Sequence, residues 1–193
     1  MIQSVFFDVG GVLGESLAQC TYEKLRRTHV HHHRLRRLLH DERVLTGPAG
    51  TLDSLLKTEF RDVGLSSMEI FASFENAQAY PENIDIARDL KSKGIVVGII
   101  SEQIAESASL LQKKMKDFEG LFELVLLSPY TGLTKKSRHI FDMVRERVGY
   151  EAHEMLMIDD SRINIKSAKA AGWNGIHYAY PRSLKERIQE YGI

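Results

Sequence analysis

The sequence predicts an α/β fold in which a doubly wound parallel sheet forms the middle of three layers. Short apolar runs recur along the chain, and they are continuous in apolar character, as is typical of strands buried on both faces. Stretches with helical apolar spacing lie between them, and such alternation favours parallel strands joined by right-handed crossovers. The expected strands are residues 2–9, 95–101, 124–128, 155–159 and 175–178.

The expected helices have recognisable first and last residues. Ser137 and Asn164 each open an apolar pattern as potential N-caps, whereas Gly94, Gly149 and Gly172 each follow one, as is typical of helix ends. The expected helices of the α/β part are residues 84–93, 103–118, 137–148, 164–171 and 183–191.

One long stretch interrupts this alternation. Residues 15–80 contain no strong strand pattern, only helix-like runs at 20–39, 51–62 and 66–77. We therefore expect a helical cap at 15–80, inserted after the first strand, with 1–14 and 81–193 forming the α/β core. A cap there would lie over the carboxyl edge of the sheet, where it could act as a lid.

Composition narrows the class of protein. With 193 residues and 43% apolar content, the chain suits one compact domain with an inserted subdomain. Lys plus Arg and Asp plus Glu each number 26, which gives no reason to expect a membrane or nucleic-acid partner. The single Cys20 cannot form an internal disulfide, and no apolar run approaches the ~20 residues of a membrane span. We expect a cytoplasmic protein, and the sequence does not indicate its oligomeric state.

The charge is unevenly distributed. Residues 24–40 hold six Lys or Arg residues and five histidines but no acid, so they create a local positive field. Because only residues three or four apart share a helix face, His29 with His32 or His33 is the one plausible metal-binding pair. We favour a solvated basic helix that could draw anionic substrates toward a cleft.

Polar side chains stand where several expected strands end. Asp8 follows the first apolar run, Ser101 ends the second, Lys135 follows the third, and Asp159 and Asp160 end the fourth. The carboxyl ends of parallel strands form the ligand-binding edge of open α/β sheets. Clustered carboxylates suit Mg²⁺ better than zinc, which prefers His and Cys. A hydroxyl at a strand end, followed by N–H groups at a helix start, can bind phosphate.

Each of these residues also has a simpler interpretation. Asp8 could cap a turn, and Ser101 could cap a helix. Asp159 and Asp160 could be a helix cap beside a solvated acid. For Asn164 we favour a helix cap, with support of the site as the alternative. The joint occurrence of the acids, the hydroxyl and the lysine at successive strand ends favours a site.

In this order and spacing, four motifs resemble those of the haloacid dehalogenase superfamily, whose members are mostly phosphatases that form an aspartyl phosphate. The first is matched by Phe6–Leu13, the second by Ile99–Ser101, the third by Lys135 and the fourth by Ile158–Asp160. The resemblance covers nearly the whole chain. It implies a Rossmann-like core, a small helical cap of the type inserted after the first strand, and hydrolysis of a small phosphorylated metabolite.

The resemblance also implies roles for individual residues. Asp8 would attack phosphorus, and Mg²⁺ would be held by Asp8, the Gly10 carbonyl and Asp159, with Asp160 supporting it directly or through water.

On the substrate side, Ser101 and Lys135 would hold the phosphoryl oxygens, with Gly11 and Glu102 also in the substrate-binding set.

The chain departs from the family pattern at three positions in or beside these motifs. Gly10 stands where most such phosphatases carry an acid/base aspartate, a function worth ~10²–10⁴-fold in rate. One hypothesis is a substrate whose leaving group needs little protonation, such as a sugar 1-phosphate, an acyl phosphate or an aryl phosphate. Glu102 replaces a common Asn, and Lys136 replaces a frequent proline beside Lys135.

Two alternatives follow from these departures and from the superfamily's range. The chain could be a weakened relative that binds a ligand or protein, or it could hydrolyse carbon–halogen bonds by a related aspartate-nucleophile reaction. The paired acids Asp159 and Asp160 suit Mg²⁺, and they therefore argue against carbon–halogen hydrolysis.

Overall fold

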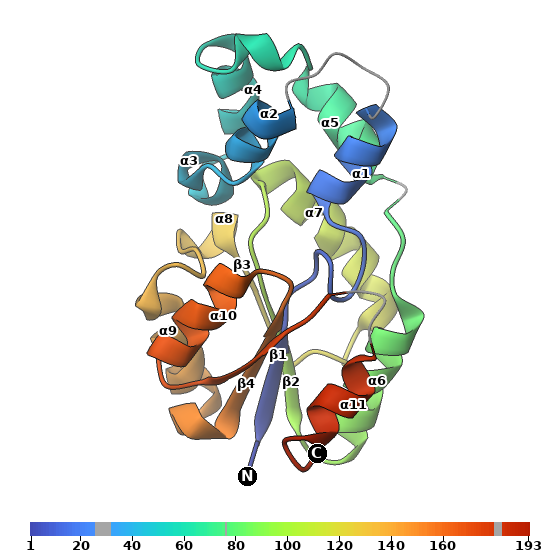
Figure 1. Cartoon of the computed structure of the whole chain (residues 1–193), viewed down its shortest axis with the longest axis vertical. Helices are drawn as coiled ribbons and strands as arrows, with labels where there is room; N and C mark the ends of the chain where they lie inside the picture. The colour runs from blue at the N-terminus through green and yellow to red at the C-terminus, as the bar shows by residue number, and fades with distance from the viewer. Residues whose placement is uncertain (26–31, 76, 180–182) are drawn as a thin grey trace.

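The computed structural model describes residues 1–25, 32–75, 77–179 and 183–193, and its chain forms a sheet-containing part and a helical part (Figure 1). Part of the expected helix 20–39 lies outside these residues, as do His29 and His31, so the histidine-pair hypothesis is not tested.

Within the described residues, five parallel strands form one sheet in the order β3-β2-β1-β4-β5. The central strand pairs Phe7 with Ile99 of β2 and with Ile158 of β4, so the residues that follow these strands emerge side by side. The predicted parallel α/β sheet is therefore confirmed. The strands are β1 (Ser4–Phe7), β2 (Val96–Ser101), β3 (Leu124–Leu127), β4 (Met155–Asp159) and β5 (Asn174–His177).

Helices cover both faces of the sheet. In β1, Val5 and Phe7 belong to the apolar core on one face, and Phe6 belongs to the core on the other. All three are fully buried, which explains why the strand reads as a continuous apolar run. The first face packs against α6 (Pro81–Ser92), α7 (Ala105–Lys114) and α11 (Leu184–Gln189), and the second against α9 (Arg138–Val148) and α10 (Arg162–Ala170).

Some element boundaries differ from expectation. The strand expected to end at Ser128 stops one residue earlier, because α8 (Ser128–Thr131) begins there with a proline in its first turn. The expected helix 103–118 begins at Ala105 and tightens into the 3₁₀ helix η2 (Met115–Phe118). The N-cap of α10 is Ser161, not Asn164, so the cap interpretation of Asn164 was wrong. A further 3₁₀ helix, η3 (Ala152–Glu154), precedes β4.

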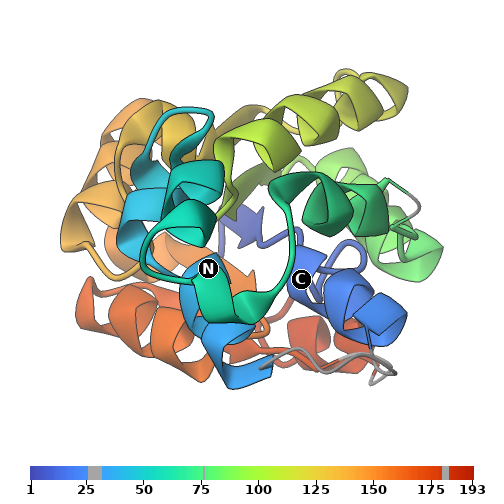
Figure 2. The same ribbon diagram turned by 90° about the horizontal axis from the view of Figure 1, so that it is seen from above.

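The chain between β1 and α6 forms a helical insertion over the carboxyl end of the sheet (Figures 1 and 2). It has its own apolar core, which also buries Ile104 from the β2–α7 connection. The short α3 had no helical signal, and its N-cap is Asp41. The insertion consists of α1 (Leu17–Leu25), α2 (His32–Leu39), α3 (Glu42–Thr46), α4 (Thr51–Lys57), η1 (Arg61–Val63) and α5 (Ser67–Phe74). None of the described helices is long and apolar enough to cross a membrane.

Candidate active site

Asp8 lies directly beyond β1, where its N–H donates to the Ile158 carbonyl (2.9 Å). Its side chain is buried, and the Oδ1 atom accepts hydrogen bonds from the Val9 N–H (2.8 Å) and the Ser101 hydroxyl (2.8 Å). Lys135 Nζ lies 3.0 Å from the same oxygen. Among the described residues, no hydrogen-bond donor reaches Oδ2, so this oxygen remains available to a ligand.

Lys135 supplies a buried positive charge. Its side chain is 1% exposed, and Nζ lies 2.5 Å from Asp159 Oδ2 and donates to the Ile100 carbonyl (3.3 Å). Burial alone would lower the lysine pKa, but Asp159 and Asp8 outweigh it and hold the pKa above its ordinary value. The neighbouring Lys136 is exposed. Of the two adjacent lysines, Lys135 is therefore the one that contacts the carboxylates.

Asp159 is fully buried and held by a dense set of donors. Its Oδ1 accepts from the Ser161 N–H (2.7 Å), and the Asn164 amide donates to Oδ1 (3.1 Å) and Oδ2 (3.2 Å). Asn164 thus orients the acid, which is the alternative role considered for it. The available signal was an amide in the first turn of the helix that follows the acid.

Asp160 extends over the turn after β1. A Cβ atom on Gly11 would lie 2.6 Å from Asp160 Oδ2, and Gly11 has a left-handed φ of +77°. Only glycine meets both requirements without strain. The Gly11 N–H donates to the Gly14 carbonyl (2.7 Å), so it serves the turn, and a substrate contact by Gly11 stays a prediction.

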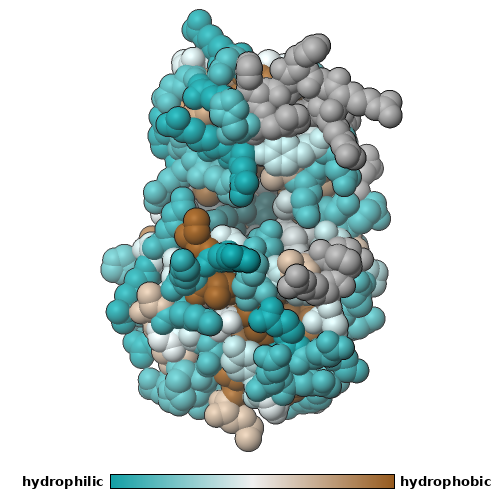
Figure 3. Space-filling model, in the orientation of Figure 1, coloured by the Kyte–Doolittle hydropathy of each residue, from teal (hydrophilic) through white to brown (hydrophobic). Residues whose placement is uncertain are grey.

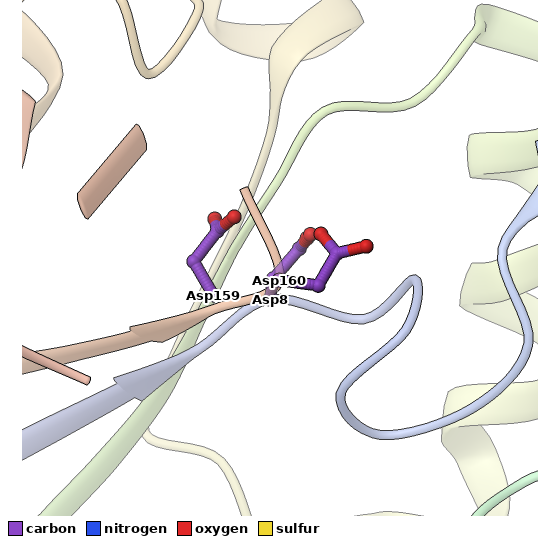
Figure 4. A group of neighbouring side chains, drawn as sticks. All are labelled: Asp8, Asp159 and Asp160. Carbon is purple, nitrogen blue, oxygen red and sulfur yellow. The ribbon is translucent and has the colours of Figure 1, made fainter. Parts of the chain in front are cut away.

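Asp8, Asp159 and Asp160 bring carboxylate oxygens within 4.8 Å of one another (Figure 4). Burial and the neighbouring acids raise the pKa of Asp8 to about 7 and that of Asp160 to about 6, although Lys135 opposes both shifts. Among the described side chains of this cluster, three carboxylates face one ammonium, which leaves two negative charges. An all-oxygen donor set with this excess fits a hard divalent cation.

The β2–α7 connection supports Ser101. The Gln103 side-chain amide donates to the Ser101 hydroxyl (3.0 Å), a contact that no sequence motif indicated. The Gln103 N–H donates to the Ser128 hydroxyl (2.9 Å), so it does not serve the phosphate-binding role expected of this segment. Glu102 Oε1 accepts from the Lys135 N–H (2.9 Å), which gives the unexpected acid a partner.

A cavity of about 920 Å³ lies between the sheet edge and the insertion, and the surface is visibly hollowed there (Figure 3). Asp8, Gly10 and Asp160 line it from the sheet side, and Tyr22 and Arg36 line it from the insertion. The position that lacks the usual aspartate is tight, because a Cβ on Gly10 would lie 2.9 Å from Ser16 Cβ.

A buried aspartate after the central strand, a lysine that bridges it to a second aspartate and a helical insertion above them define the class of haloacid dehalogenase-like hydrolases. The chain belongs to the haloacid dehalogenase-like hydrolase family, whose model matches residues 2–172.

The chain is similar in sequence to phosphoglycolate phosphatases and in fold to several solved structures. The chain is 29% identical over 135 residues to a phosphoglycolate phosphatase of Aquifex aeolicus, covering 65% of this chain and 60% of that protein. The match therefore covers less than two thirds of the length of that protein. It covers 45% of the length of a phosphoglycolate phosphatase of Escherichia coli.

Among solved structures, BT-2542 from Bacteroides thetaiotaomicron, complexed with magnesium and inorganic phosphate, superposes with a TM-score of 0.70. The identity is 21%, and the superposition covers 97% of this chain and 99% of that chain. The L-2-haloacid dehalogenase of Xanthobacter autotrophicus, with chloropropionic acid covalently bound, has a TM-score of 0.69 (16% identity; 98% and 82%).

Proposed function

We propose that this chain is a Mg²⁺-dependent phosphatase that hydrolyses a small phosphorylated metabolite through an aspartyl phosphate on Asp8. The observation that carries the proposal is the arrangement at Asp8, whose Oδ1 is held by Ser101 and Lys135 while Oδ2 has no donor among the described residues. The phosphatase relative of Aquifex aeolicus and the magnesium and phosphate bound to the Bacteroides protein support it.

The residues present fit the cation. Asp8, Asp159 and the Gly10 carbonyl would hold Mg²⁺, with Asp160 supporting it directly or through water. When bound, Mg²⁺ would offset the two excess negative charges of the cluster and allow a phosphate dianion to approach a carboxylate.

Asp8 Oδ2 then attacks phosphorus, and the bond between phosphorus and the ester oxygen breaks. When the phosphate binds, Lys135 and the Ser101 hydroxyl would turn donors from Asp8 Oδ1 to the phosphoryl oxygens and offset the charge that develops on them. Water attacks the phosphorus of the aspartyl phosphate, which releases inorganic phosphate and restores the Asp8 carboxylate. Glu102 and Gly11 would border the bound phosphoryl group.

In this proposal, residues 15–80 act as a cap over a core of residues 1–14 and 81–193. The cap would exclude water while the aspartyl phosphate exists. Because Gly10 supplies no proton to the leaving group, the enzyme would favour esters with good leaving groups, such as sugar 1-phosphates.

The second candidate is a ligand-binding relative with weakened catalysis, and the observation that favours it is Gly10. Carbon–halogen hydrolysis is disfavoured because the acids and Lys135 form a site suited to a cation and a phosphate.

Phosphate release from a metabolite panel in Mg²⁺ tests the proposal. We expect release by the unmodified chain, a loss of at least 10³-fold in Asp8→Asn, and no change in Asp85→Asn, which removes an exposed carboxylate on α6. Absence of release from every ester, or equal release by the two variants, would contradict the phosphatase.

A further inference from the structure

One face of α2 lines the cavity with basic side chains. Arg36 and Arg37 lie three and four residues after His33, so all three share one side of the helix, and His40 follows at the same spacing just beyond the last residue of α2. All four residues line the cavity. The opposite side of α2 is fixed in the core of the insertion by Leu35, Leu38 and Leu39.

The arginines of α2 divide into two kinds. Arg34, outside the cavity, is paired with Asp62 through Nε (3.0 Å) and Nη2 (3.1 Å). In the described part of the chain, Arg36 and Arg37 have no hydrogen bond or ion pair with a carboxylate, although both line the cavity. Exposed arginines without a partner are common, but both of these line the same cavity, and the planar guanidinium of each presents N–H groups suited to a carboxylate or phosphate.

The core side of the cavity adds to this charge. Lys136 and Arg162 also line it and make no ion pair with any described residue. The acids that line the cavity outside the aspartate cluster already have partners, because Glu15 accepts from the Gln78 N–H (2.9 Å) and Glu102 accepts from the Lys135 N–H (2.9 Å). These bonds leave both carboxylates charged, but among the described residues neither Glu15 nor Glu102 forms an ion pair with Arg36 or Arg37, so the two guanidinium groups remain available to a ligand.

The size of the cavity bears on the ligand. A volume of about 920 Å³ lies near the upper end of the range for small-molecule sites, ~300–1,000 Å³. A phosphate at Asp8 would occupy only a small part of it, which leaves room for a carbon skeleton between Asp8 and α2.

We propose that the substrate carries a second anionic group, a carboxylate or a second phosphate, and that Arg36 and Arg37 bind this group while the scissile phosphate lies at Asp8. The proposal rests on the proposed function for the position of the scissile phosphate. It defines the substrate class as phosphorylated acids or bisphosphates and makes Arg36 and Arg37 specificity-determining residues.

Binding is measured by calorimetry to the Asp8→Asn protein in Mg²⁺, so that turnover does not enter the result. The probes are 4-carboxyphenyl phosphate against phenyl phosphate, and 6-phosphogluconate against sorbitol 6-phosphate, which present the second anion at two spacings. For at least one pair we expect the doubly anionic member to bind about 10- to 100-fold more tightly. Arg36→Gln and Arg37→Gln should abolish this preference and leave the binding of the singly anionic member within threefold.

Arg61→Gln is the matched control, because it removes the same charge from an exposed position of the insertion that does not line the cavity. It should keep the full preference. Equal affinities within both pairs, a preference that survives both arginine substitutions, or no binding of any probe would overturn the second-anion proposal. Phosphate release by the unmodified chain tests the phosphatase separately, so hydrolysis of singly and doubly anionic esters at equal efficiency would leave that function standing while the second-anion proposal failed.

Discussion

Lys135 Nζ lies 2.5 Å from Asp159 Oδ2, and both side chains are almost completely removed from solvent. The same ammonium lies 3.0 Å from Asp8, so one lysine joins the acid that ends β4 to the acid that follows the neighbouring β1. A buried ion pair gains little over an apolar pair of the same shape, but the loss of one member leaves the other charge unpaired.

Lys135→Met should therefore destabilise the fold strongly, because Asp159 and Asp8 would then repel each other in a buried site. We expect a loss of about 3–5 kcal/mol in the free energy of unfolding, measured by urea denaturation without divalent cations. Lys136→Met, at the adjacent exposed position, should change it by less than about 0.5 kcal/mol. If the two substitutions lowered the free energy of unfolding equally, the contacts of Lys135 with Asp8 and Asp159 would not contribute to stability as expected.

Asn164→Ala removes the amide that donates to both oxygens of Asp159. Loss of a residue that orients a metal ligand typically costs 10–100-fold in metal affinity, so we expect Mg²⁺ binding to weaken by about that factor. Titration calorimetry measures it directly. The comparison variant is Asn174→Ala, because Asn174 donates to backbone carbonyls at the opposite end of β4, and its Mg²⁺ affinity should equal that of the unmodified chain.

The stabilisation by Mg²⁺ should increase with pH. In the ion-free protein the pKa values of Asp8 and Asp160 are raised to about 7 and about 6, so between pH 4 and 7 the folded state binds more protons than the unfolded state. The stability that these groups contribute therefore falls as pH rises through that window, and bound Mg²⁺ would restore it. The rise in Tm caused by Mg²⁺ should be larger at pH 8 than at pH 5. A rise that is the same at both values would contradict the cation site at these acids.

Gly11→Ala tests the close approach of Asp160 to the turn. Gly120 has the same φ of +77°, but a Cβ there would meet no atom within 4 Å, so Gly120→Ala measures the conformational cost alone. That cost is about 1–2 kcal/mol, and Gly11→Ala should cost more and also weaken Mg²⁺ binding by moving Asp160. Equal destabilisation, with Mg²⁺ affinity retained, would mean that the Asp160 position does not depend on Gly11.

The parallel sheet and the meeting of Asp8, Ser101 and Asp159 were predictable, because strand ends in a parallel sheet converge on one edge. Lys135 comes from the loop between α8 and α9, and its contact with Asp8 and Asp159 depends on the path of that loop. The direction of individual side chains was not predictable. Nothing in the local sequence shows that Glu102 turns toward the N–H of Lys135.

The supporting residues were also hidden from sequence reasoning. Gln103 and Asn164 act through contacts with residues that only the folded chain brings near, and an amide in a first helical turn has several ordinary uses. The short α3 has too few residues for a helical period to be visible, since its helix depends on packing and on the Asp41 cap.

Ile104 links the insertion to the segment that carries Ser101. It is 2% exposed and lies in the apolar core of the insertion, only three residues after Ser101, and nearby the Glu106 side chain accepts from the Gly50 N–H (2.8 Å). A hinge motion that lifted the insertion away would expose Ile104, at a cost of about 1.5–3 kcal/mol, unless the β2–α7 connection moved with it. We therefore expect a ligand that moves the insertion to shift the Ser101 hydroxyl as well. Binding of a ligand under the insertion would then be coupled to the orientation of Asp8, which accepts a hydrogen bond from that hydroxyl.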